Sequence, residues 1–298
     1  MDGGRPVSAP GPAEVEFALV DVFAETPLTG NALAVVPDAD ALDVATMRAI
    51  AREFNQSETT FVCAGGPGVT WRLRSFTAAG HEVSGAGHNA VGAWIWLHAA
   101  GRVGAGTFTQ RIGGDVLPVE VADGDPVRIV MRQSAPRFGR EVRERAALAA
   151  ALGLTEADLV ADRPAQVVST GAGHLLVPLV DRPAVDRVTV DATRLVALLS
   201  DVDGEGCYVY TTSGGESAYA RFFNPGMGLV EDPATGTAAG PLAVQLVRSG
   251  DADPAHPVLV DQGAATGRPS RLRIDVDGDR VHLSGTGLIT ATGRLRVR

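Results

Sequence analysis

The apolar positions of this chain fall mostly into short runs separated by polar or glycine-rich turns. Apolar runs of roughly four to eight residues that end at turn residues are typical of β-strands. In the first half they predict strands at residues 16–23, 31–36, 59–62, 69–76, 116–121 and 127–131. In the second half they predict strands at residues 165–169, 175–180, 207–212 and 219–223.

Helical spacing is confined to fewer and longer stretches. The clearest follows Asp43, a predicted N-cap, and places Met47 and the apolar residues at i+3, i+4 and i+7 on one face before Asn55 ends it. Further helices are predicted after residues 87–89, over 143–152, over 191–199 and over 241–248. Pro241 suits the first turn of the last one. Because strands outnumber helices, the pattern favours an α+β fold with mixed or antiparallel sheets.

Turn residues predict where the strands fold back. The Asp-Gly pair at residues 123–124 joins two predicted strands into a hairpin. Two more hairpins are predicted near the end of the chain, around residues 277–278 and 292–293.

Two stretches about half a chain apart share one order of elements. Residues 74–89 and 221–237 each read as a strand, a turn of small residues and the start of an apolar helix. If the halves are duplicated lobes, the two turns face each other across one cleft. We therefore expect two pseudo-symmetric lobes, each with a sheet wrapped around a central helix. The expected boundaries are a flexible leader at 1–14, an N-terminal lobe at 15–133 and a C-terminal lobe at 134–298, with the last strand pairing back onto the first lobe.

Composition narrows the classes of partner. The chain has 298 residues, of which 45% are hydrophobic, enough for two lobes with cores of their own. The formal net charge of −9 argues against nucleic acid and anionic membranes as partners. The sequence has neither a long apolar run nor the pattern of a secretion signal at its start, so we expect a soluble, cytoplasmic protein. Cys63 and Cys207 fall in strand-like runs and are expected to be buried thiols.

Three ionisable residues stand beside the predicted turns. Glu58 lies where a helix stop meets an apolar strand, a place where burial can raise the pKa of a carboxyl group. Asp232 precedes a proline and is held extended, and His88 begins a helix. A raised pKa suits a group that gives and takes a proton near neutrality. The alternative interpretations are local: a turn formed by Ser57 and Glu58, a helix-capping acid and a structural histidine.

The two turns also carry backbone amides. Gly87 and Gly236 each lie at a predicted helix start, where free N–H groups and the helix dipole favour an anion, and Thr237 adds a hydroxyl. A small carboxylate substrate fits such a cradle. Residues 85–90 also match the loose dinucleotide pattern, but no βαβ unit surrounds them. No nucleophile elbow, zinc motif, phosphate loop or Cys-x-x-Cys occurs in the sequence, so hydrolase, metalloenzyme and kinase interpretations have no residue support.

Several longer strings resemble one known family. They are Asp21-Val22-Phe23 with residues 30–36, residues 52–62 with Ser57-Glu58-Thr59-Thr60-Phe61, residues 76–77 with 85–88, residues 169–171 with 175–179, and Glu231-Asp232-Pro233-Ala234-Thr235-Gly236-Thr237-Ala238. In this order, over residues 16–298, they resemble the PhzF-like (phenazine biosynthesis) isomerase family.

The resemblance implies a diaminopimelate-epimerase-like fold, with the site between two lobes, as a homodimer and without a metal or organic cofactor. In the best-known member, which isomerises trans-2,3-dihydro-3-hydroxyanthranilate, the equivalent of Glu58 is the main proton carrier. His88 and Asp232 match the other two ionisable residues of that family, and Thr237 stands in place of a serine. The expected catalytic residues are therefore Glu58, Asp232 and His88. The expected substrate contacts are Ser57, Gly87, Asn89, Gly236 and Thr237.

Departures from the family pattern bear on the substrate. Asn89 replaces the usual small residue or proline, and Thr237 adds a methyl group. Related racemases use two cysteines, whose places Ala86 and Thr235 occupy here, so two-thiol racemisation is disfavoured. The sequence thus predicts a cofactor-independent isomerase that shifts double bonds in a small unsaturated carboxylate, in secondary metabolism. The alternatives are an isomerase for alkylproline-type antibiotic precursors and a catalytically silent member that binds a metabolite or a protein.

Overall fold

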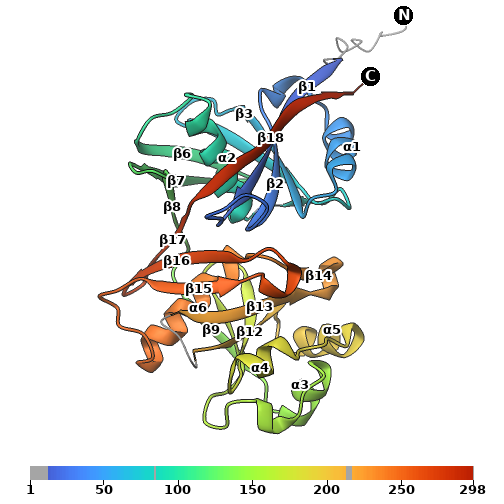
Figure 1. Ribbon diagram of the computed structural model, residues 1–298, viewed down its shortest axis with the longest axis vertical. Coiled ribbons are helices and arrows are strands. Elements are labelled where there is room, and N and C mark those ends of the chain that lie inside the picture. The colour runs from blue at the N-terminus through green and yellow to red at the C-terminus, as the bar shows by residue number, and fades with distance from the viewer. Residues whose placement is uncertain (1–12, 84, 213–216, 298) are drawn as a thin grey trace, which may run out of the picture.

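The structure is a computed structural model that describes residues 13–83, 85–212 and 217–297. Most of the predicted leader lies outside these residues, and the first strand begins at Glu14. The described part of the chain forms eighteen strands and six α-helices (Figure 1). The first half contains β1 (Glu14–Val22), β2 (Asn31–Val36), α1 (Val44–Phe54), β3 (Glu58–Ala64), β4 (Trp71–Phe76), β5 (Glu82–Val83), α2 (His88–Ala99), β6 (Gly106–Ile112), β7 (Asp115–Ala122) and β8 (Arg128–Arg132).

The second half repeats this order with additions. It contains β9 (Arg137–Glu141), α3 (Arg145–Ala151), β10 (Gln166–Ser169), β11 (Gly173–Pro178), α4 (Arg182–Asp186), α5 (Ala192–Asp201), β12 (Gly206–Thr211), β13 (Ala218–Asn224), β14 (Leu229–Asp232), α6 (Gly236–Ser249), β15 (Val258–Gln262), β16 (Ser270–Asp277), β17 (Arg280–Gly285) and β18 (Gly287–Arg296). The strands β5, β6, β9, β14 and β15 and the helix α4 are not predicted from the sequence.

Local signals set the limits of several elements. The carboxylate of Asp43 accepts a hydrogen bond from the Thr46 amide at 2.8 Å, and Asn55 ends α1 in the left-handed conformation. The carboxylate of Asp191 caps α5 in the same way. The predicted hairpins at residues 123–124 and 277–278 are confirmed by the pairing of β7 with β8 and of β16 with β17. Cys63 and Cys207 are buried free thiols, as predicted.

The strand pairings of the two halves correspond one to one. In the first half, β1–β2, β3–β4, β4–β5, β6–β7 and β7–β8 are antiparallel, whereas β2–β3 and β4–β6 are parallel. In the second, β10–β11, β12–β13, β13–β14, β15–β16 and β16–β17 are antiparallel, whereas β11–β12 and β13–β15 are parallel. The protein therefore has a mixed α/β fold in which one topology occurs twice.

The strands that follow the two repeats of this topology, β9 and β18, each pair with the first strand of the other repeat. β9 follows β8 in the chain but pairs with β10, and β18 follows β17 but pairs with β1. β8 and β17 pair with each other and join the sheets. In Figure 1, β18 runs from the lower group of elements to the upper one, where it lies beside β1.

The hairpin predicted around residues 292–293 is wrong, because β18 passes straight through this position. Gly293 pairs with Phe17 of β1. A Cβ at Gly293 would lie 2.7 Å from the Cε1 atom of the Phe17 ring. Glycine is therefore suited to this position because an aromatic ring covers the strand there. The glycine does not indicate a turn.

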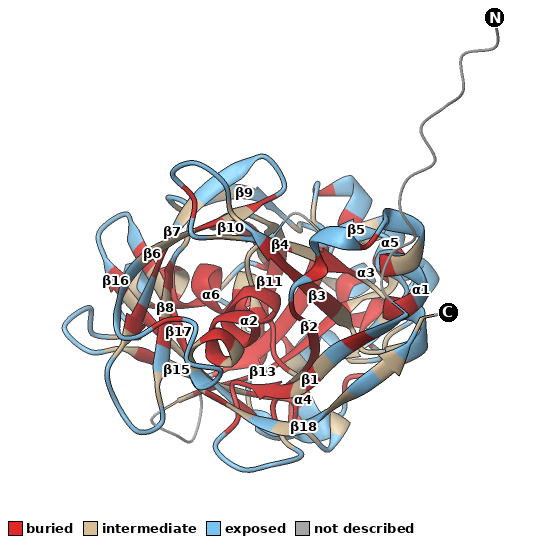
Figure 2. Cartoon of the chain, turned by 90° about the horizontal axis from the view of Figure 1, so that it is seen from above, coloured by how far each residue is buried: buried red, intermediate tan, exposed pale blue. Residues whose placement is uncertain are grey.

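Helices α2 and α6 occupy the interior, as Figure 2 shows by their red colour inside the ring of strands. Nine of the twelve residues of α2 are buried, and its apolar side chains point in all directions, as expected of an enclosed helix. The prediction for α6 was wrong at its start: the helix begins at Gly236, so Pro241 lies inside it. None of the helices in the described ranges is long and apolar enough to span a bilayer.

The end of β17 packs closely against the first half. A Cβ at Gly285 would lie 2.6 Å from Phe23 Cε1 and 2.8 Å from Val91 Cγ1. Gly285→Ala is therefore expected to lower the free energy of unfolding by about 1–3 kcal/mol, measured by urea denaturation, because the ring and the methyl group must move. Gly114→Ala is the matched control, since its Cβ would meet no atom within 4 Å. Equal urea midpoints for the two variants would contradict close packing at this junction.

Candidate active site

Glu58 begins β3 and is partly buried, with its Oε2 atom shielded from solvent. Burial raises the pKa of its carboxyl group to about 8, and the nearby charge of Asp232 adds to the rise. Its Oε2 atom has no hydrogen-bond partner among the described residues. The side chain is therefore protonated at neutral pH and retains unused hydrogen-bonding capacity.

Asp232 ends β14, immediately before α6. Its Oδ1 accepts a hydrogen bond from Asn31 Nδ2 at 2.8 Å, and its Oδ2 accepts one from the Thr235 hydroxyl at 2.5 Å. Burial raises the pKa of Asp232 to about 6, although these two hydrogen bonds oppose the rise. At neutral pH, Asp232 is therefore mostly ionised while Glu58 is protonated, so the two carboxyl groups differ in state.

A chain of hydrogen bonds connects the two halves through this site. Ser57 donates its hydroxyl proton to Asn31 Oδ1 at 3.2 Å, and the Asn31 amide donates to Asp232. His88 Nε2 lies 3.3 Å from Ser57 Oγ. Burial lowers the pKa of His88 to about 4, so the ring is neutral at pH 7. Because the Ser57 proton is already donated to Asn31, the geometry favours His88 as an Nε2–H donor to Ser57.

The first turns of α2 and α6 meet beside this chain. A Cβ at Gly87 would lie 4.0 Å from the Cγ2 atom of Thr237. The positive ends of the two helix dipoles are therefore brought together, which favours an anion between them. Gly236 is suited to its place because a Cβ there would lie 2.4 Å from Leu283 Cδ2.

Asn89 is occupied by local hydrogen bonds. Its Oδ1 accepts from the backbone amides of Gly87 at 2.7 Å and Ala90 at 2.9 Å, and its Nδ2 donates to Ser75 Oγ and the Gly85 carbonyl. The sequence predicts a free backbone amide at Gly87. This prediction is wrong, because the amide donates to the Asn89 side chain. Asn89, the second residue of α2, therefore has its side-chain amide fully engaged in local hydrogen bonds.

Sequence reasoning missed three polar residues of this region. The sequence pattern assigns Asn31 to a strand and to a string that resembles the family but gives it no role in the site, although it contacts Asp232 and Ser57. Gln262 donates to the Asp232 carbonyl at 2.7 Å and accepts from the Tyr208 hydroxyl. His174 lies 3.1 Å from the Thr237 hydroxyl. Their one signal in the sequence is a single polar residue within or next to an apolar run, which is not specific.

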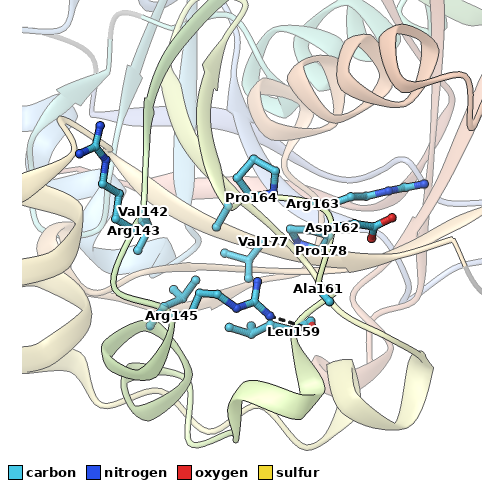
Figure 3. A pocket seen from close by; sticks show the side chains of 12 residues that line it. Val142, Arg143, Arg145, Leu159, Ala161, Asp162, Arg163, Pro164, Val177 and Pro178 are labelled. Carbon is cyan, nitrogen blue, oxygen red and sulfur yellow. Dashed lines mark hydrogen bonds between the residues drawn. The ribbon is translucent and has the colours of Figure 1, made fainter.

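A cavity of about 250 Å³ lies away from these residues, between α3 and β11 (Figure 3). Its cations are largely engaged: Arg145 donates to the carbonyls of Val160 and Leu159, and Arg163 pairs with Asp251. None of the predicted site residues lines it. The described residues also contain no group of three or more His, Cys, Asp or Glu side chains arranged to hold a metal ion.

Comparison with known proteins identifies relatives across nearly the whole chain. The model of the PhzC-PhzF family, described as phenazine biosynthesis-like protein, matches residues 20–293. The chain is 34% identical over 291 residues to trans-2,3-dihydro-3-hydroxyanthranilate isomerase of Pseudomonas fluorescens, a match that covers 94% of this chain and 98% of that protein.

Solved structures give the same result for the fold. A predicted epimerase from Pseudomonas aeruginosa superposes with a TM-score of 0.84 at 34% identity, covering 94% of this chain and 99% of that one. A hydroxyproline epimerase from Agrobacterium vitis superposes with a TM-score of 0.65 at 8% identity, covering 95% and 92%. The second match shows a shared epimerase-like fold and no more.

Proposed function

This chain belongs to the PhzC-PhzF family and is an isomerase of that family, and from this premise we propose that it moves a proton between carbons of a small unsaturated carboxylate. The observation that carries the proposal is the protonated Glu58, with its shielded Oε2 atom, beside a hydrogen-bonded chain from His88 to Asp232. We take trans-2,3-dihydro-3-hydroxyanthranilate, the substrate in the name of the Pseudomonas fluorescens relative, as the first candidate substrate.

In this proposal Glu58 carries the proton. In its ionised form it takes a proton from one substrate carbon, and in its protonated form it delivers one to another carbon, so the double bonds shift and the enzyme returns to its starting state. A pKa of about 8 keeps both forms accessible near neutrality. The ionised Asp232 and the neutral His88 hold the polar chain in one orientation, and unequal carboxyl pKa values are typical of acid–base pairs.

The substrate carboxylate is proposed to bind between the two helix ends. The dipoles of α2 and α6 and the hydroxyl of Thr237 attract negative charge there. Carboxylate binding at this point fixes the reacting carbons relative to Glu58, which lowers the entropic part of the barrier.

Turnover in D₂O tests the proposal. Trans-2,3-dihydro-3-hydroxyanthranilate and a panel of smaller unsaturated carboxylates are incubated with the enzyme, and products are followed by NMR. We expect an isomerised product with deuterium at the reprotonated carbon when Glu58 exchanges with solvent between steps. Binding of these compounds with neither an isomer nor label at carbon would instead indicate a catalytically silent binding protein.

The Thr237 methyl group favours a second candidate, an unsaturated carboxylate smaller than this dihydro ring compound. This methyl faces Gly87 and narrows the space between the helix ends. Thr237→Ser is expected to raise kcat/KM for the ring substrate about tenfold relative to a smaller carboxylate, the lower range for one apolar carbon. Steady-state kinetics on both compounds measure this ratio. Thr237→Val is the control, because it keeps the methyl and removes the hydroxyl. If the ratio of kcat/KM values for the two compounds is the same in Thr237→Ser as in the wild type, the methyl group has no part in substrate selection.

A further inference from the structure

His174 is a buried polar residue that the proposed reaction has not yet used. It lies on β11, and its Nε2 atom is 3.1 Å from the Thr237 hydroxyl oxygen. The ring of Phe222 meets the imidazole edge-on, with centroids 4.9 Å apart, and restricts its rotation. The Nδ1 atom of His174 is buried and has no hydrogen-bond partner among the described residues.

The charge state of His174 limits what the ring can do. Burial lowers its pKa to about 4, so the imidazole is neutral at pH 7 and has one N–H group. Two tautomers are then possible. In the first, Nε2–H donates to Thr237 and Nδ1 is a bare acceptor. In the second, Thr237 donates to Nε2 and the Nδ1–H group is left without a partner.

The two tautomers differ in cost. Buried N–H donors without a partner are rarer in folded proteins than unsatisfied acceptors, and an unpaired buried polar group costs about 1–3 kcal/mol. The Nε2–H tautomer uses the single donor of the ring and is therefore favoured. It also leaves the hydroxyl proton of Thr237 free, because the Thr237 oxygen then accepts from the ring.

We propose that His174 is a positioning residue that commits the Thr237 hydroxyl to donate toward an ionised carboxylate of the substrate. This inference rests on the proposed function, because it assumes that the carboxylate lies at the start of α6. A hydroxyl whose oxygen accepts from His174 has its proton available for an acceptor atom of the substrate. The site therefore favours a carboxylate, whose ionised oxygens accept a stronger hydrogen bond from this hydroxyl, over the matching carboxamide, whose carbonyl oxygen is neutral.

A double-mutant cycle tests the coupling between His174 and Thr237. The probes are anthranilate and its amide 2-aminobenzamide, with binding measured by calorimetry. His174→Phe is expected to weaken anthranilate binding about tenfold and to reduce the preference for anthranilate over the amide. In His174→Gln the side-chain amide can supply an N–H donor near the place of the histidine Nε2 atom. This variant is expected to retain most of the affinity for anthranilate and most of the preference over the amide. The variant with both His174→Phe and Thr237→Val is expected to match Thr237→Val alone.

The results separate this inference from the proposed function. Three results would overturn the inference. They are additive losses of affinity in the double variant, the same preference for anthranilate over the amide in wild type and His174→Phe, and no binding of anthranilate to the wild type. Nitrogen-15 NMR of wild-type protein provides a test without a ligand or a variant: we expect His174 to be protonated on Nε2 and bare on Nδ1. The opposite tautomer would overturn it as well. If no carboxylate is isomerised while the cycle and the tautomer hold, the proposed function fails and the role of His174 stands.

Discussion

Glu58→Gln is expected to lower turnover by at least about a hundredfold, the lower range for loss of a general acid–base group. Glutamine matches the shape of the protonated carboxyl group but cannot carry a proton between carbons. Single-turnover kinetics on the substrate found in the D₂O experiment give the rate of the chemical step. Glu53→Gln, an exposed change on α1, is the control and should leave the rate unaltered. Turnover near the wild-type rate in Glu58→Gln would remove Glu58 from the mechanism.

The same variant is expected to be more stable than the wild type at neutral pH. The pKa of Glu58 in the folded protein, about 8, lies above its ordinary value of 4.5. The contribution of Glu58 to stability is therefore fully present below pH 4.5 and is lost as the pH rises through 8. Glutamine does not titrate, so the variant gains roughly 3 kcal/mol at pH 7, at about 1.4 kcal/mol for each pKa unit. Urea unfolding at pH 4 and pH 7 checks that the difference disappears at the lower pH.

Asp232→Asn is expected to slow the reaction by about a hundredfold and to move its pH dependence. An asparagine amide cannot accept at both of the positions where Asn31 and Thr235 now donate, so the chain that links the halves is broken. The negative charge of Asp232 raises the pKa of Glu58, so its removal lowers that pKa. The limb of the pH–rate profile that belongs to Glu58, near pH 8 in the wild type, should shift toward acid.

Asp261→Asn controls for the loss of a carboxylate as such. Asp261 is bonded to Arg271 and Ser217, and its charge is not among the causes that raise the pKa of Glu58. Its pH–rate profile should coincide with that of the wild type. A slow Asp232→Asn enzyme with an unshifted limb would mean that Asp232 acts without electrostatic coupling to Glu58.

Local chemistry made part of this fold predictable. Asp43 and Asn55 bracket a helix with a single apolar face, and both act as the caps that their residue types suggest. The errors arose where distant packing outweighs local preference. Locally Gly293 predicts a turn, but the Phe17 ring that covers it lies at the other end of the chain. Pro241 predicts a helix start, but the small residues before it already form the first turn of buried α6.

The candidate site could also be predicted only in part from the sequence. Glu58, Asp232 and His88 could be selected because each stands beside a recognisable turn, and the structure gathers them into one polar region. Asn31 and His174 could not be selected from the sequence. Asp232, the partner of Asn31, is 201 positions away in the chain, and Thr237, the partner of His174, is 63 positions away. Neither residue occurs in a pattern that predicts chemistry, and only the folded arrangement shows which groups they meet.

The pairing of β1 with β18 bears on how this chain is made. β1 leaves the ribosome long before β18, its neighbour on one side. Until then β1 presents an unpaired edge, and such edges readily pair with other chains. Contacts between segments so far apart in the chain also form slowly. Completion of the first sheet must therefore follow synthesis of nearly all the second, and a cut between the halves would separate β1 from β18 and β8 from β17.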